Sequence, residues 1–212
     1  MTLIYLIRHG ETDWNLNGRW QGQINIPLNE TGRQQARLLA AHLRQYRGLF
    51  GRLYSSDLGR AWDTAAIIGE ALGQSPAALP GWRELDVGCW GGLTRAEQIA
   101  LDPALYERFQ AGEDVAYGGA ERWSDLVART RRGLDRISER HPRETVAIVT
   151  HGGPIRACLD HIAHLETPRC GPDLAVVNTS YSVLRREAGR WIVVSANNRP
   201  HLETVADTAR LL

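Results

Sequence analysis

Two short apolar runs, far apart in the chain, are each followed within two residues by a histidine. Residues 3–7 are apolar and continue into Arg8 and His9, while residues 146–150 are followed by His151. Continuous apolar runs of this length are typical of strands that are buried on both faces of a parallel sheet. We therefore predict a sheet in which these two strands are interior and both histidines stand at strand ends.

Helical periodicity between these runs predicts that strands and helices alternate along the chain. Apolar residues recur at helical spacing after Thr31, which we expect to be a helix N-cap. The other predicted helices cover 58–72, 94–100, 103–110, 121–140 and 154–164, and the other predicted strands cover 53–55, 176–185 and 191–196. This order predicts an α/β fold of three layers, with a mostly parallel central sheet and helices on both faces. The last two strands would add an antiparallel edge.

The length of 212 residues suits a single domain over 1–212. Glycine and proline recur within residues 81–120, where only short helices are expected. We therefore predict that residues 81–120 form an inserted, lid-like region over the main sheet.

Composition argues against several functional classes. A formal net charge of +1 gives no basic footprint for nucleic acid. No apolar run reaches the roughly 18 residues that span a bilayer, so no membrane partner is expected. The N-terminus lacks the features of a signal peptide, which predicts a cytoplasmic protein. Cys89, Cys158 and Cys170 have no metal-type spacing, so we expect no metal site.

The two histidines mark a candidate site. In an open α/β sheet, ligands gather outside the carboxyl ends of the strands, so His9 and His151 could face one crevice. Arg8 precedes His9, and Arg60 begins the predicted helix that follows another strand. Arginine forks match phosphate oxygens, which favours an anion site, although a single arginine is more often a solvated surface charge. Spacing alone does not choose between Glu84 and Asp86 as an acid.

Several motifs, in order, resemble those of the histidine phosphatase superfamily, whose members share a phosphoglycerate mutase-like fold. They are Leu6-Ile7-Arg8-His9-Gly10-Glu11-Thr12, Ser55-Ser56-Asp57-Leu58-Gly59-Arg60-Ala61, Arg83-Glu84-Leu85-Asp86-Val87-Gly88, Gly118-Gly119-Ala120-Glu121 and Val149-Thr150-His151-Gly152-Gly153, with a further block over 15–36. The resemblance covers essentially the whole chain. It points to the phosphatase branch, which includes α-ribazole phosphatase and broad-specificity phosphatases.

The resemblance implies a mechanism for phosphomonoester hydrolysis. His9 would attack phosphorus and form a phosphohistidine, which divides one difficult displacement into two easier ones. Arg8, Arg60 and His151 would hold the phosphoryl oxygens, and Glu84 would act as the general acid and base. No cofactor or metal is required, because the arginines supply the positive charge. Further substrate contacts are implied for Asn15, Gln21, Gly22 and Gly152, although the two amides could instead stabilise their loop.

Family mutases carry a tyrosine where this chain has Val87, and valine cannot donate that hydrogen bond. The continuation over 90–94 also resembles phosphatases, so we predict hydrolysis of a small phosphorylated metabolite. A cofactor-dependent phosphoglycerate mutase is the alternative. A catalytically inactive binding protein of the same fold is a third reading, and it predicts the loss of a catalytic group.

The substrate and the oligomeric state stay open at this stage. Residues 95–120 should line the mouth of the pocket, with Tyr106, Arg108, Phe109 and Tyr117 offering both apolar and charged groups. The partner is expected to be a small-molecule phosphomonoester. Relatives include monomers, dimers and tetramers, so a homodimer is one of the states that the sequence leaves open.

Overall fold

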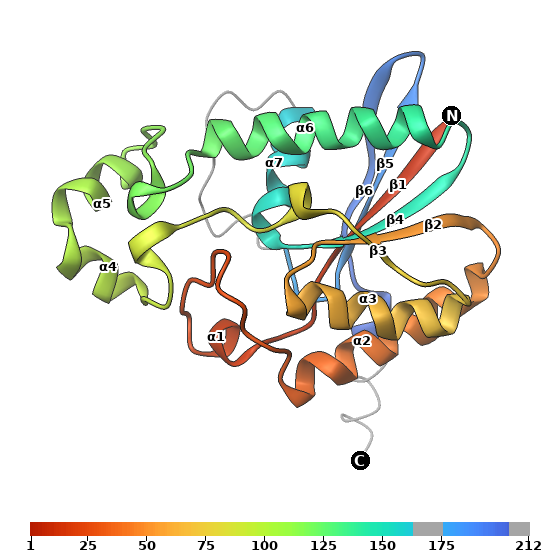
Figure 1. Cartoon of the computed structure of the whole chain (residues 1–212), viewed down its shortest axis with the longest axis horizontal. Helices are drawn as coiled ribbons and strands as arrows, with labels where there is room; N and C mark the ends of the chain where they lie inside the picture. The colour runs from red at the N-terminus through yellow and green to blue at the C-terminus, as the bar shows by residue number, and fades with distance from the viewer. Residues whose placement is uncertain (163–175, 204–212) are drawn as a thin grey trace.

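A computed structural model describes residues 1–162 and 176–203. It contains a six-stranded sheet with the strand order β3-β2-β4-β1-β5-β6 (Figure 1). The strands are β1 (Thr2–Arg8), β2 (Phe50–Ser55), β3 (Ala77–Ala78), β4 (Thr145–Thr150), β5 (Tyr181–Glu187) and β6 (Arg190–Asn198). The helices are α1 (Asp13–Leu16), α2 (Glu30–Leu43), α3 (Gly59–Leu72), α4 (Arg95–Leu101), α5 (Pro103–Gln110), α6 (Trp123–Arg140) and α7 (Gly152–Ile162).

The sheet is mostly parallel, as predicted. β1 pairs in parallel with β4, and β2 pairs in parallel with both β3 and β4. β5 pairs antiparallel with β1 and with β6, which forms the predicted antiparallel edge. β1 and β4 therefore occupy the interior of the sheet, where continuous apolar runs are expected.

Helices cover both faces of the sheet. Side chains alternate along each strand, so neighbouring residues of one strand pack against different helices. On β4, Val146 and Ile148 pack on one face with residues of α6 and α7. Ala147 and Val149 pack on the other face with residues of α2 and α3. Figure 1 shows these two helix pairs on opposite sides of the strands. The three-layer α/β arrangement is therefore confirmed.

Several predicted elements begin at other residues than expected: β2 begins at Phe50 and not at 53, α6 at Trp123 and not at 121, and α7 at Gly152 and not at 154. α2 begins at Glu30, because the Asn29 side chain, and not that of Thr31, accepts a hydrogen bond from the backbone N–H of Gly32. The predicted strand 176–185 begins only at Tyr181, since Thr179 has a φ of 58°, which no strand residue adopts. The short elements β3 and α1 were not predicted, and residues 163–164 of the last predicted helix lie outside the described residues.

Residues 81–120 form short helices at one end of the molecule, with α4 and α5 projecting beyond the sheet (Figure 1). They enclose an aromatic core that includes Trp90, Tyr106 and Phe109. The backbones of this region meet at Gly88 and Gly118, where a Cβ on Gly118 would lie 2.0 Å from the Val87 carbonyl oxygen. Within the described residues, no helix is long and apolar enough to cross a membrane.

Candidate active site

The parallel pairing of β1 and β4 brings the two histidines together. Arg8 lies opposite Thr150 in the register, so His9 and His151 follow at the same edge of the sheet. The His9 backbone N–H donates to the Thr150 carbonyl at 3.0 Å. The two imidazole rings lie with their centroids 5.1 Å apart. The structure therefore places these two predicted site residues side by side.

His9 is held in one tautomer. Its Nδ1 lies 2.7 Å from the Gly10 carbonyl oxygen, which can only accept, so Nδ1 carries the proton and Nε2 keeps its lone pair. His9 is only 2% exposed. Burial, followed by the charges of Arg60 and Arg8, lowers the pKa of His9 well below 6.5. The imidazole is therefore neutral at neutral pH, with the Nε2 lone pair free of a proton.

His151 is fully buried behind His9 and does not line the cavity itself. Its Nε2 lies 2.8 Å from the Ser56 hydroxyl oxygen. Burial, followed by the charges of Arg60 and Arg8, lowers the pKa of His151 well below 6.5. This imidazole is also neutral, so it can offer a hydrogen bond but not a full charge.

Two arginines flank His9 and supply the positive charge. The two terminal nitrogens of Arg60 donate to the carbonyls of Gly22 and Ile24 at 2.7 and 2.8 Å. Arg8 donates to the carbonyl of Val176. Burial lowers the pKa of Arg60 to about 10, so its guanidinium stays charged at neutral pH. In the described part of the chain, the buried Nε atoms of both arginines have no partner, which leaves donors for an anion.

The carboxylate of Glu84 is held by hydrogen bonds against the first turn of α7. It accepts hydrogen bonds from the backbone N–H of Gly153 at 3.1 and 3.2 Å, and from that of Leu85 at 2.8 Å. A Cβ on Gly153 would lie 2.1 Å from the carboxylate, so only glycine allows this approach. Asp86 instead accepts from Gly88 and lies outside the cavity lining. The geometry therefore favours Glu84 over Asp86.

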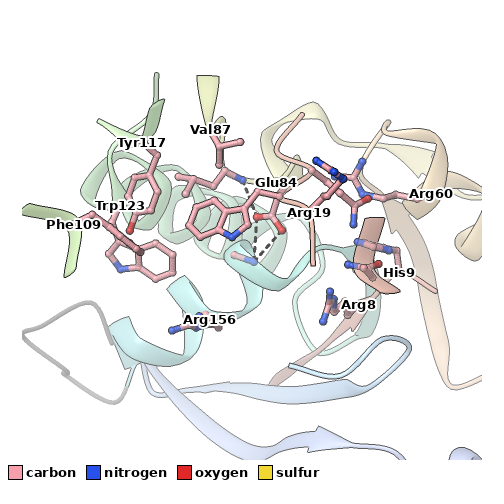
Figure 2. A pocket seen from close by; sticks show the side chains of 15 residues that line it. Arg8, His9, Arg19, Arg60, Glu84, Val87, Phe109, Tyr117, Trp123 and Arg156 are labelled. Carbon is pink, nitrogen blue, oxygen red and sulfur yellow. Dashed lines mark hydrogen bonds between the residues drawn. The ribbon is translucent and has the colours of Figure 1, made fainter. Parts of the chain in front are cut away.

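These groups border a cavity of about 260 Å³ (Figure 2). Asn15 and Gln21 line it as well, whereas Gly22 and Gly152 do not. The Gly22 carbonyl accepts a hydrogen bond from Arg60. Gly152 lies next to Arg8, where a Cβ would be 3.8 Å from the Arg8 Nε. The remaining lining residues are Arg8, His9, Arg19, Trp20, Arg60, Glu84, Leu85, Val87, Phe109, Tyr117, Trp123, Gly153 and Arg156.

The sequence was compared with models of known protein families. Residues 4–199 match the model described as histidine phosphatase superfamily (branch 1). The chain belongs to the histidine phosphatase superfamily. Its cavity is lined by His9, Arg60 and Glu84, and His151 lies buried next to His9.

Several phosphoserine phosphatases are similar to this chain over most of their length. The chain is 35% identical over 209 residues to the metal-independent phosphoserine phosphatase of Arabidopsis thaliana, covering 97% of this chain and 85% of the relative. It is 31% identical to phosphoserine phosphatase 1 of Hydrogenobacter thermophilus, covering 95% of each. A solved phosphoserine phosphatase variant from Entamoeba histolytica, in complex with phosphoserine, superposes with a TM-score of 0.86 at 29% identity, covering 95% of this chain and 100% of that one.

The sequence analysis missed several residues at or next to the cavity, among them Asn178, Arg129 and Arg156. Asn178 donates to the His9 carbonyl at 3.0 Å and to the Asn15 amide oxygen at 3.3 Å. Arg129 donates to the carbonyl of Glu84 at 2.9 Å from the neighbouring helix α6. Arg156 lines the cavity from α7. No spacing signal could reveal them, because each depends on contacts between distant segments.

The predicted mouth residues divide between the cavity and the protein core. Phe109 and Tyr117 line the cavity, while Tyr106 packs in the aromatic core. Arg108 is exposed and pairs with Glu113 at 2.8 Å. Over residues 1–162 and 176–203, no group of three or more His, Cys, Asp or Glu side chains is placed to hold a metal.

Proposed function

We propose that this protein hydrolyses phosphate monoesters of small metabolites without a metal, through a phosphohistidine on His9. The observation that carries the proposal is the state of His9. It is buried and neutral, its Nδ1 is tied to the Gly10 carbonyl, and the charged Arg8 and Arg60 lie beside it. Glu84 lies at the same cavity and can supply a proton (Figure 2).

The first step transfers the phosphoryl group to the protein. The His9 Nε2 lone pair attacks phosphorus, the phosphorus–nitrogen bond forms, and the bond from phosphorus to the ester oxygen breaks. Glu84 donates its proton to the departing alkoxide. Arg8 and Arg60 stabilise the charge that spreads over the phosphoryl oxygens, while His151 is a neutral neighbour that offers a hydrogen bond.

The second step returns His9 to its starting state. The Glu84 carboxylate removes a proton from a water molecule, which attacks phosphorus and breaks the phosphorus–nitrogen bond. Inorganic phosphate leaves with the oxygen from water, and Glu84 is again protonated. General acid or base catalysis by a group such as Glu84 typically accelerates a step by about 10²–10⁴-fold.

Hydrolysis is favoured over phosphoryl return to the substrate. Val87 forms part of the cavity lining, where a mutase tyrosine would hold its substrate, and it offers no hydrogen bond. The relatives named above are phosphatases. An inactive binding protein is not supported, because Arg8, His9, Arg60 and Glu84 all reach the cavity.

The test measures free phosphate and isomerised product from a panel of phosphate esters in the presence of a chelator. We expect phosphate release that is lost by at least about 10³-fold in His9→Ala. A protein-bound phosphate that survives base and is lost in acid would support the intermediate. His42→Gln, on α2, is the matched histidine control and keeps activity. Full activity of His9→Ala, or isomerised phosphoglycerate without free phosphate, would overturn the proposal.

A further inference from the structure

Arg156 lines the cavity, and two of its guanidinium N–H groups, at Nε and Nη2, are buried without a hydrogen-bond partner among the described residues. Nor does its guanidinium take part in an ion pair with any of these residues. Buried N–H donors without an acceptor cost free energy, so the Nε and Nη2 atoms of Arg156 indicate a site that an anionic ligand completes.

The helix that carries Arg156 fixes its distance from the reacting groups. Gly152 and Gly153 open α7 against Arg8 and Glu84. Arg156 comes three residues after Gly153 and four after Gly152. It therefore lies on the same face of the helix, one turn of about 5.4 Å further on. Its guanidinium carbon lies 5.9 Å from the centre of the Trp123 ring, which orients the planar fork.

The other arginines that line the cavity already have partners or lie next to His9. Arg19 pairs with Glu97 at 2.8 Å and donates to the Gly92 carbonyl at 2.6 Å. Arg8 and Arg60 stand next to His9 and serve the phosphoryl group. Figure 2 shows Arg156 and Trp123 on the opposite side of Glu84 from Arg60. A substrate phosphate at His9 therefore leaves Arg156 free to bind another part of the same molecule.

We propose that Arg156 binds a carboxylate on the leaving group, so that the substrates are phosphate monoesters of small hydroxy acids. This inference rests on the proposed function. A planar guanidinium can donate two parallel hydrogen bonds to a carboxylate, which matches an anion one helical turn from the phosphoryl site. In O-phosphoserine and in 3-phosphoglycerate, one oxygen and two carbons separate phosphorus from the carboxyl carbon, a span suited to this spacing.

Two matched pairs of esters isolate the carboxylate. O-Phosphoethanolamine is O-phosphoserine without the carboxylate, and glycerol 3-phosphate has a hydroxymethyl group in place of the carboxylate of 3-phosphoglycerate. We expect the wild type to favour the carboxylate-bearing member of each pair in kcat/KM. Arg156→Met keeps the apolar stem and removes the donors. It should lower the preference about 30-fold, the size expected for a hydrogen bond to a charged group.

Arg156→Lys restores the charge without the fork and should recover part of the preference. Arg132→Met removes an exposed positive charge from α6 and is the matched control, which should keep the wild-type preference. An unchanged preference in Arg156→Met, with phosphate still released, would overturn the role of Arg156 and leave the proposed function standing.

A binding measurement tests Arg156 without turnover. Titration calorimetry with O-phosphoserine on His9→Ala, and on the same variant that also carries Arg156→Met, should show about 30-fold weaker binding in the double variant. The loss for O-phosphoethanolamine should be much smaller. Equal losses for the two esters would overturn the carboxylate assignment, even if the protein released no phosphate from any ester.

Discussion

The neighbours of His9 decide which form of this imidazole meets a substrate. Burial and the charges of Arg60 and Arg8 lower its pKa, so its proton binds only when the pH falls well below 6.5. An ordinary histidine would be half protonated near pH 6.5, and the protonated half could not attack phosphorus. The surroundings of His9 therefore extend the neutral, reactive form toward acid.

The first prediction concerns this titration. In the substrate-free protein, the His9 ring resonances followed by NMR should show no protonation step between pH 8 and pH 6. Arg60→Met removes one of the charges that oppose protonation, so it should raise the pKa of His9 toward 6.5. A wild-type step centred near 6.5 would contradict the assigned electrostatics.

A second prediction separates Glu84 from its neighbour Asp86. Glu84→Gln should lower kcat/KM by about 10²–10⁴-fold for esters with a poor leaving group, such as the alkoxide of serine. The loss in the first step should be much smaller for p-nitrophenyl phosphate, since p-nitrophenolate leaves without a proton. Asp86→Asn is the matched control and should behave as wild type with both esters. Equal losses for both esters in Glu84→Gln would rule out Glu84 as the acid.

Helix α6 positions the segment that carries Glu84. Arg129 donates to the carbonyls of Arg83 and Glu84 at 2.8 and 2.9 Å, and its guanidinium pairs with Glu121 at 2.6 Å. Glu121 in turn accepts from the Asp86 backbone N–H at 3.0 Å. This pair is largely shielded from solvent, with the side chains 19% and 14% exposed, so it holds the loop more firmly than a surface ion pair.

The third prediction follows from this contact. Arg129→Met should lower kcat about tenfold or more, because Glu84 then loses its fixed position relative to the leaving group. The loss should be larger for poor leaving groups than for p-nitrophenyl phosphate, as for Glu84→Gln. Arg132→Met, at an exposed position on the same helix, is the control. A loss that is equal for all leaving groups would indicate a structural effect alone.

The sequence predicts elements well where burial leaves a pattern. The runs at 3–7 and 146–149 are apolar throughout because helices cover both faces of β1 and β4. β5 was predicted too early, because Val176 and Val177 are apolar and no local pattern reveals the positive φ of Thr179. Motifs identified the candidates His9, Arg60 and Glu84. Arg129 and Arg156 escaped, because their contacts depend on how α6 and α7 pack against the cavity.

The whole molecule keeps several histidines neutral inside its folded structure. His9, His151 and His201 are at most 4% exposed. Burial lowers the pKa of all three, that of His201 to about 4. In the unfolded chain the same side chains bind protons near pH 6.5. Below that pH the unfolded state therefore holds more protons than the folded state, and the folded protein loses stability as the pH falls.

The fourth prediction is that the free energy of unfolding decreases between pH 7 and pH 5. Each histidine that stays neutral in the folded state should contribute a loss of about 2 kcal/mol at pH 5. Urea denaturation at pH 7, 6 and 5 measures the slope, and His201→Gln should reduce it by about one proton. Asp57 does not obscure the result, because Arg83 lowers its pKa and its contribution is lost only at more acid pH. A free energy of unfolding that stays constant from pH 7 to pH 5 would mean that these histidines are protonated in the folded protein, and His9 could then not be the neutral nucleophile.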